Sequence, residues 1–131
     1  MSLSPLPIKR PIPLWFGLGR RIAPYPPEAV LNRIGRLADG WLPLFFPGPE
    51  GEECKRKVHA AARAAGRDPS KLGMEMTLAI AGKNTAQMLD DAKRLRDFGV
   101  THAQVRWENV SPQDDLEVLK RFAGEVMAKF R

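Results

Sequence analysis

Short apolar runs alternate with amphipathic stretches along the whole chain. Four runs have the length of a strand and lie near residues 12–18, 41–46, 74–81 and 101–107. In the third run, Met74, Met76 and Leu78 alternate with Glu75 and Thr77. Because successive side chains of a strand point to opposite faces, this alternation predicts a sheet with one apolar face.

Each strand-like run is followed by a stretch with the apolar period of an amphipathic helix. We expect helices over residues 27–38, 50–65, 84–99 and 111–130, the third capped by Asn84 or Thr85. A strand followed by a helix, four times over, predicts an α/β fold with a parallel sheet and a single domain over residues 1–131. The expected core positions on the helices are Val30, Ile34, Leu37, Ala38, Cys54, Val58, Ala61, Ala62, Ala65, Met88, Ala92, Leu95, Leu116, Leu119, Ala123, Val126 and Phe130.

Two architectures accept this order of elements. One is a small open sheet with helices on both faces, and the other is half of an eight-stranded β/α barrel. The composition and the periodicity of the sequence do not distinguish them.

The composition is that of a globular domain. The chain has 131 residues, of which 44% are hydrophobic and 27% charged, and these values exclude a disordered or fibrous protein. The longest apolar run, residues 41–47, is far shorter than the roughly 18 to 20 residues of a membrane span. Cys54 is the only cysteine, so no disulfide can form within the chain. Prolines interrupt the first residues where a signal peptide would be apolar, and we expect a cytoplasmic protein.

The net charge of +6 is concentrated near the start of the sequence. Six basic residues and only one acidic residue, Glu28, precede residue 37. Beyond that point basic and acidic residues are interspersed, and no basic stripe carries interleaved aromatic residues. This distribution argues against a nucleic-acid partner.

Four short motifs follow one another in an order that resembles a known family. Residues 10–17 read Arg-Pro-Ile-Pro-Leu-Trp-Phe-Gly, and residues 36–41 read Arg-Leu-Ala-Asp-Gly-Trp. Residues 60–69 (Ala-Ala-Ala-Arg-Ala-Ala-Gly-Arg-Asp-Pro) and 98–102 (Phe-Gly-Val-Thr-His) continue the series. The set is similar to the C-terminal half of luciferase-like monooxygenases, the flavin- or deazaflavin-dependent enzymes of the bacterial luciferase-like superfamily. In that family the first two motifs form consecutive strand ends of a TIM-type barrel.

The resemblance implies four β/α units that form the C-terminal half of a TIM-type (β/α)8 barrel. A complete barrel takes about 250 residues. A half barrel would expose two strand edges and the inward face of its sheet, and both are liabilities for a monomer. We therefore expect a homo-oligomer, most simply a two-fold dimer, or a complex with a chain that supplies the missing half barrel.

The resemblance also directs attention to the loops after the strands, where β/α barrels bind ligands. In the family, small residues after the first of these strands approach the phosphate or ring of FMN or a reduced deazaflavin. Each candidate has a purely structural alternative: a surface loop rich in arginine, a solvated lysine, or pairing of Arg106 with Glu75, Glu108 or a partner subunit. The candidate cofactor-binding residues are Gly17, Gly19, Arg20, Arg21, Lys83 and Arg106.

No catalytic constellation is visible in the sequence, and acid–base groups would have to come from the missing half of the barrel. Cys54 and the three tryptophans fit packing better than reactivity or flavin stacking, and His102 fits a structural role at the start of a strand. Two function classes stay open. The first is a luciferase-like oxidoreductase fragment or subunit that retains the cofactor-phosphate half of the barrel. The second is a non-catalytic, self-associating half barrel left by truncation of such an enzyme.

Overall fold

Four parallel strands form one sheet in their sequence order. β1 (Trp15–Leu18), β2 (Gly40–Pro43), β3 (Gly73–Ala79) and β4 (His102–Arg106) lie in the order β1-β2-β3-β4. The computed structural model describes residues 11–19, 22–107 and 112–130. The predicted α/β fold with a parallel sheet is confirmed.

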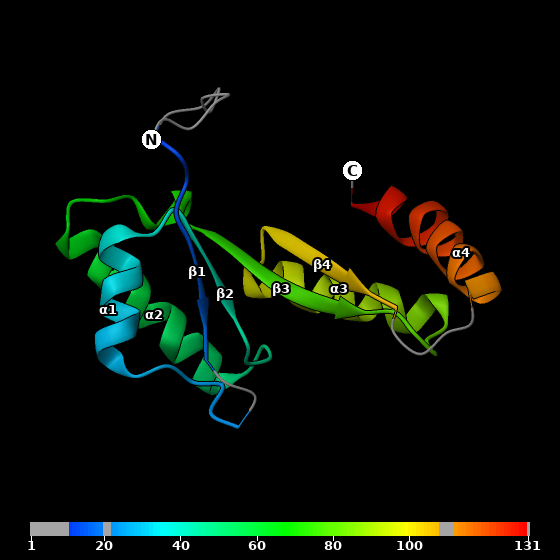
Figure 1. The fold of residues 1–131 in the computed structure, drawn as a ribbon, viewed down its shortest axis with the longest axis horizontal. Coiled ribbons are helices and arrows are strands. Elements are labelled where there is room, and N and C mark those ends of the chain that lie inside the picture. The colour runs from blue at the N-terminus through cyan, green and yellow to red at the C-terminus, as the bar shows by residue number, and fades with distance from the viewer. Residues whose placement is uncertain (1–10, 20–21, 108–111, 131) are drawn as a thin grey trace, which may run out of the picture.

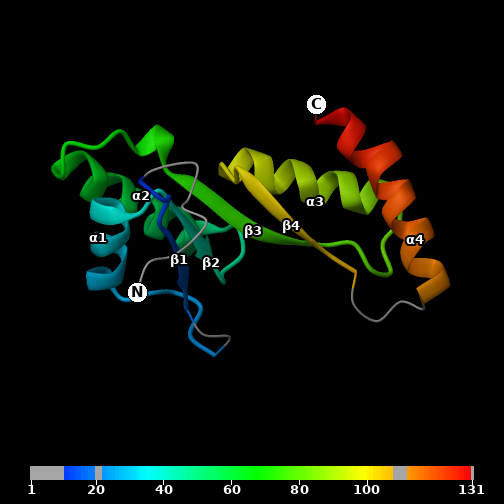
Figure 2. The same cartoon turned by 45° about the horizontal axis from the view of Figure 1, so that its top comes forward.

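A helix follows every strand. These helices are α1 (Glu28–Leu37), α2 (Pro49–Ala64), α3 (Thr85–Phe98) and α4 (Pro112–Arg121). A 3-10 turn, η1 (Pro69–Lys71), precedes β3. After α4 the chain continues as a π-helical turn η2 (Phe122–Val126) and a 3-10 turn η3 (Met127–Lys129). Figures 1 and 2 show α1 and α2 together beside β1 and β2, α3 along β3 and β4, and α4 at the far end of the molecule. No helix within the described residues is long and apolar enough to cross a membrane.

The helices cover only one face of the sheet. Met74, Met76 and Leu78 of β3 are buried among the helices, whereas Thr77 and Ala79 on its other face are exposed. The pairing register aligns the covered side of all four strands. The buried residues of β2 and β3 belong to one connected core, and Phe16, Leu18 and Val105 of the outer strands pack against it. We call the other side the open face. Within the described residues, the fold is therefore not the sheet with helices on both faces.

The sheet is narrow at its centre. The β1–β2 pair has four residue pairs and the β3–β4 pair has five, but β2 and β3 pair only at Gly40–Gly73 and Trp41–Met74. β2 ends at Pro43, before the predicted end at residue 46, since proline has no backbone N–H to donate. Beyond this contact the two strand pairs diverge, so that their carboxyl ends lie in different parts of the molecule (Figure 1).

The core departs from the predicted stripes in two helices. In α1, Leu31 and Gly35 are buried and Leu37 is exposed, a rotation of the buried face by about one residue. In the last helix the π turn changes the phase of the stripe, because its hydrogen bonds join residues five apart, and Phe122 is buried. The predicted core residues that prove exposed are Leu37, Ala65, Leu116, Ala123 and Phe130.

Two local predictions are confirmed by the helix ends. The side chain of Asn84 accepts a hydrogen bond from the backbone N–H of Gln87, and the Gln87 side chain accepts one from the backbone N–H of Asn84. This capping box begins α3, and Gly99 ends it with a φ of 96°, in the left-handed region. Both ends are encoded within a few residues of sequence.

Candidate functional site

The indole of Trp15 lies on the open face, across the first residues of β2 and β3. A Cβ atom at Gly40 would lie 2.4 Å from this ring, and one at Gly73 would lie 2.6 Å from it. The rings of Trp15 and His102 meet edge to face, with centroids 5.1 Å apart. Oγ1 of Thr101 lies 2.9 Å from Nδ1 of His102. These residues form a packed cluster at the amino ends of the strands.

The packing interpretation fits two of the three tryptophans. Trp15 belongs to the packed cluster just described. Trp41 is 1% exposed, and its ring packs edge to face against Phe45. Trp107 follows β4 and is exposed. His102 begins β4, as expected, and its contacts are structural ones.

Beyond this cluster, toward the carboxyl ends of the strands, the open face is polar on the β3–β4 side. Glu75 pairs with His102 in the register, and Thr77 pairs with Gln104. Arg106 ends β4 on the same face. All of these side chains are exposed except Glu75, which is half-buried. A carboxylate, an imidazole, an amide and a guanidinium therefore share one solvent-accessible surface that can donate and accept hydrogen bonds.

The two candidate glycines differ in the space that surrounds them. Gly17 lies within β1, and a Cβ atom there would meet nothing within 4 Å. Gly19 has a φ of 88°, and a Cβ atom there would lie 2.8 Å from the backbone oxygen of Pro24. Gly19 is thus required by the close approach of its own loop. Arg20 and Arg21 lie outside the described residues.

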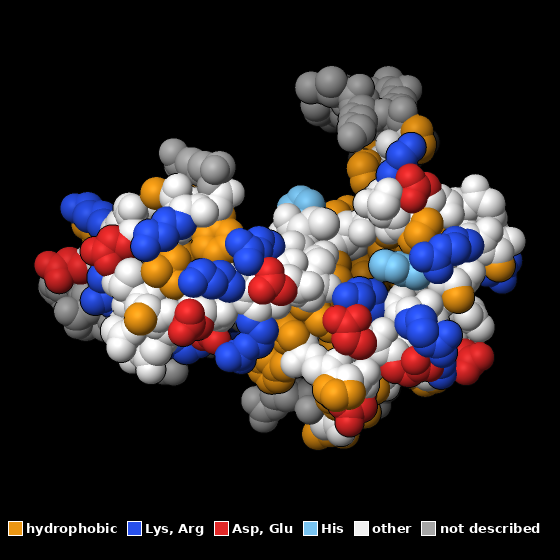
Figure 3. All heavy atoms as spheres, turned by 180° about the vertical axis from the view of Figure 1, so that it is seen from behind, with side chains coloured by type: hydrophobic (Ala, Val, Ile, Leu, Met, Phe, Trp, Pro, Cys, Tyr) orange, Lys and Arg blue, Asp and Glu red, His pale blue; other side chains and the backbone are white. Residues whose placement is uncertain are grey.

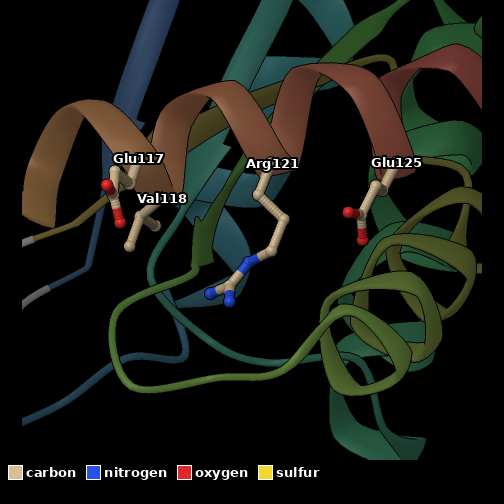
Figure 4. A pocket seen from close by; sticks show the side chains of 4 residues that line it. All are labelled: Glu117, Val118, Arg121 and Glu125. Carbon is tan, nitrogen blue, oxygen red and sulfur yellow. The ribbon is translucent and has the colours of Figure 1, made fainter.

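Lys83 is held by the protein at the carboxyl end of β3. Its Nζ lies 2.6 Å from Oδ2 of Asp91 in α3, and its backbone oxygen accepts a hydrogen bond from Nη2 of Arg121. The hydroxyl of Thr85 donates to Glu125 in η2. Figure 4 shows Arg121 extending from the last helix toward the loop between β3 and α3. The Lys83 ammonium is thus paired with Asp91, and its side chain is 32% exposed.

The structure divides the candidate residues into two groups. Lys83 and Arg106 belong to the carboxyl end of the β3–β4 pair, where the N–H of Ile80 donates to the oxygen of Arg106. Gly17 and Gly19 belong to the carboxyl end of the β1–β2 pair. Since β2 and β3 diverge after two residue pairs, the two groups are not brought together. One ligand at either end would contact only part of the predicted set.

The perturbed titratable groups lie away from the open face. Burial raises the pKa of the Cys54 thiol, which is free and buried as predicted. Burial, with the neighbouring Arg63 and Lys55 charges, lowers the pKa of His59 on α2. No group of three His, Cys, Asp or Glu side chains among the described residues is placed to hold a metal ion. On the surface seen in Figure 3, acidic and basic side chains are interspersed rather than gathered by sign.

Sequence reasoning missed the residues that support the site. Asp91 and Arg121 hold the loop of Lys83, and Gly40 and Gly73 make room for Trp15. One signal was available, because both β2 and β3 begin with a glycine. A glycine at the first position of two neighbouring strands indicates a large side chain or a backbone close by.

Comparisons with known proteins bear on the fold alone. No protein-family model matches the sequence, and no curated protein sequence matches it either. The fold is similar to that of the coenzyme F420-dependent tetrahydromethanopterin reductase from Methanopyrus kandleri, with a TM-score of 0.68 and 14% sequence identity. The likeness covers 92% of this chain and 51% of that chain, so this chain spans about half of that protein. At this identity the likeness concerns the fold alone.

Proposed function

We propose that this chain is the cofactor-binding half barrel of a luciferase-like oxidoreductase, with FMN or a reduced deazaflavin as the cofactor. The observation that carries the proposal is the sheet itself. Its parallel strands lie in sequential order, helices cover one face, and the other face is polar on the β3–β4 side. Its likeness to an F420-dependent reductase supports the deazaflavin as the first cofactor to test.

The residues of the open face fit such a cofactor at the β4 side. Arg106 offers an exposed guanidinium that suits a phosphate, and Gln104 offers an amide that suits the polar edge of a ring. Gly17 belongs to the other group of candidates, and it leaves space for a close approach to the backbone only on the β1–β2 side. Lys83, which is paired with Asp91, lies at the same end of the β3–β4 pair as Arg106. The bound cofactor would supply hydride or electron transfer, and the chain would bind and orient it.

Titration of cofactor fluorescence tests this proposal. We expect the chain to change the fluorescence polarisation of coenzyme F420 or of FMN. We expect Arg106→Gln to weaken binding by roughly tenfold or more, since a hydrogen bond to a charged group contributes about 1.5 to 3 kcal/mol. Arg33→Gln, on the exposed side of α1, is the matched control and should bind like the wild type. Equal binding by both variants, or no binding of either cofactor, would contradict the proposal.

A second candidate function is a non-catalytic, self-associating half barrel. Two observations favour it: the candidate residues fall into two separate groups, and Asp91 already neutralises Lys83. On this alternative the chain associates with itself and leaves the fluorescence of both cofactors unchanged. Recovery of either cofactor with the purified chain would reject it.

A further inference from the structure

The loop between β3 and α3, which carries Lys83, is fixed to the sheet at its first residues. The backbone N–H of Ile80 donates to the oxygen of Arg106 at 2.9 Å, so the end of β3 is joined to the end of β4. The backbone N–H of Lys83 donates to the oxygen of Ile80, and Gly82 between them has a φ of 68°, in the left-handed region. This tight turn keeps Lys83 at the carboxyl end of the β3–β4 pair.

The last helix, α4 with the π-helical turn η2 that continues it, holds the same loop through two hydrogen bonds. Nη2 of Arg121 donates to the backbone oxygen of Lys83 at 3.1 Å. One turn further along the helix, the carboxylate of Glu125 accepts a hydrogen bond from the hydroxyl of Thr85, the first residue of α3. The conformation of the loop therefore depends on a helix that lies about 40 positions later in the sequence.

The space beside this contact is polar. A cavity of about 400 Å³ lies along the last helix, lined by Glu117, Val118, Arg121 and Glu125. Figure 4 shows these side chains on the side of the helix that faces the loop, with Arg121 extending toward it. Arg121 and both glutamates are exposed. Because a polar, open space of this size admits water, apolar packing does not fix the loop there, and the hydrogen bonds of the last helix do.

Lys83 is thus held by three separate elements. Its backbone N–H bonds to the end of β3, its backbone oxygen to Arg121, and its ammonium to Asp91 of α3 at 2.6 Å. Only the bond to Arg121 comes from outside the unit formed by β3 and α3. A side chain that binds a ligand is effective when its neighbours fix its position. Removal of the Arg121 guanidinium would loosen the loop and leave the Lys83 ammonium and its carboxylate partner in place.

We propose that Arg121 is a positioning residue of the cofactor site. It holds the loop after β3 in the conformation that keeps Lys83 at the end of the β3–β4 pair where Arg106 lies. Arg121 acts through the loop and makes no contact of its own with the cofactor. This inference rests on the proposed function, because it concerns the same end of the sheet. The placement of the last helix thereby sets the affinity of the site.

Amide hydrogen exchange of the full chain, without cofactor, tests the hold on the loop. Arg121→Met keeps a long side chain without a donor, and we expect the amide of Lys83 to exchange roughly tenfold faster in it, about the contribution of one charged hydrogen bond. The amide of Thr101, bonded to Met74 at the other end of β3, should keep the wild-type rate. Arg121→Lys retains a charged donor and should recover part of the protection. Lys120→Met, exposed on the same helix, is the matched control.

Cofactor titration of the same variants tests the consequence for the site. We expect Arg121→Met to weaken binding of coenzyme F420 or FMN by roughly threefold or more, because binding must then also order the loop. Arg121→Lys should restore part of the loss, and Lys120→Met should bind like the wild type. Circular dichroism verifies the fold. If helix content falls, Thr85→Val, which removes the hydrogen bond to Glu125, replaces Arg121→Met.

The two measurements separate the failure of this inference from that of the proposed function. A wild-type chain that binds neither cofactor would reject the proposed function and the use of the loop for a cofactor, even if the exchange data retain the hold of Arg121 on Lys83. Equal exchange of the Lys83 amide in Arg121→Met and Lys120→Met would overturn the positioning role. Faster exchange with unchanged cofactor binding would overturn it as well.

Discussion

The indole of Trp15 occupies the space where a side chain at Gly73 would have to lie. A Cβ atom at Gly73 would be 2.6 Å from Cη2 of Trp15, closer than such atoms approach one another in proteins. The same ring also covers Gly40 and meets His102 at its edge. One side chain from β1 therefore links the amino ends of all four strands across the open face. It compensates for a sheet whose central strands share only two residue pairs.

Gly73→Ala is expected to destabilise the fold by about 1 to 3 kcal/mol, because the indole must shift or the strands must separate. The conformational gain of alanine over glycine in a strand, about 0.5 to 1 kcal/mol, opposes this cost only in part. Gly17→Ala is the control, since a Cβ atom there meets nothing within 4 Å. Chemical denaturation measures the free energy of unfolding of both variants. A Gly73→Ala variant as stable as Gly17→Ala would refute the contact, and in a Trp15→Ala background the cost should disappear.

Gly35→Ala should open the crossing of α1 over α2. A Cβ atom at Gly35 would lie 2.4 Å from the backbone oxygen of Val58 and 2.7 Å from Cβ of Ala61. We expect a loss of about 2 kcal/mol, even though alanine favours a helix over glycine by about 1 kcal/mol. Gly124→Ala, in the helical turn η2 with open space around it, should be neutral or stabilising. Thermal unfolding measures the stability of both variants. A Gly35→Ala variant more stable than the wild type would contradict the close crossing.

Arg67 closes the carboxyl end of α1 from a distant loop. Its guanidinium donates to the backbone oxygens of Gly35 and Ala38, at 2.8 and 2.6 Å. Arg67→Lys is expected to cost about 1 kcal/mol or more, because an ammonium cannot reproduce the two-pronged geometry. Arg33→Ala, exposed on α1, should change the free energy of unfolding by less than about 0.5 kcal/mol. Equal stability of the two variants would show that the guanidinium contacts contribute nothing.

His59 should make the fold less stable as the pH falls. Burial and the Arg63 and Lys55 charges hold its pKa in the folded state below the ordinary value of 6.5. Below pH 6.5 the unfolded chain binds a proton that the folded chain does not, so stability is lost until the folded pKa is passed. Denaturation of the wild type and of His59→Gln at neutral pH and at about pH 5 measures the effect. The wild type should lose more stability than the variant over this range, and parallel losses would contradict the shifted pKa.

The features that the sequence predicted correctly are the locally encoded ones. The alternation of Met74, Met76 and Leu78 and the helix cap, predicted at Asn84 or Thr85 and found at Asn84, depend on residues two or three positions apart. The order of strands and helices followed from the same short-range periods, and the structure agrees with it.

The features that the sequence did not predict depend on contacts between distant segments. Trp15 meets Gly40 and Gly73 only because three strands share one register. The backbone oxygen of Lys83 likewise accepts a hydrogen bond from Arg121, which lies 38 positions later in the chain. The separation of the candidate residues into two groups likewise arises from the short β2–β3 pairing, which periodicity along a single strand cannot reveal.

Native mass spectrometry of the chain with coenzyme F420 or FMN tests the account most directly, since one spectrum reports the oligomer and the bound cofactor. The account predicts a species, of one or more 14.6 kDa chains, that carries cofactor mass. A dimer without cofactor would favour the non-catalytic half barrel and reject the cofactor-binding role. A single 14.6 kDa chain with no cofactor would contradict the account as a whole.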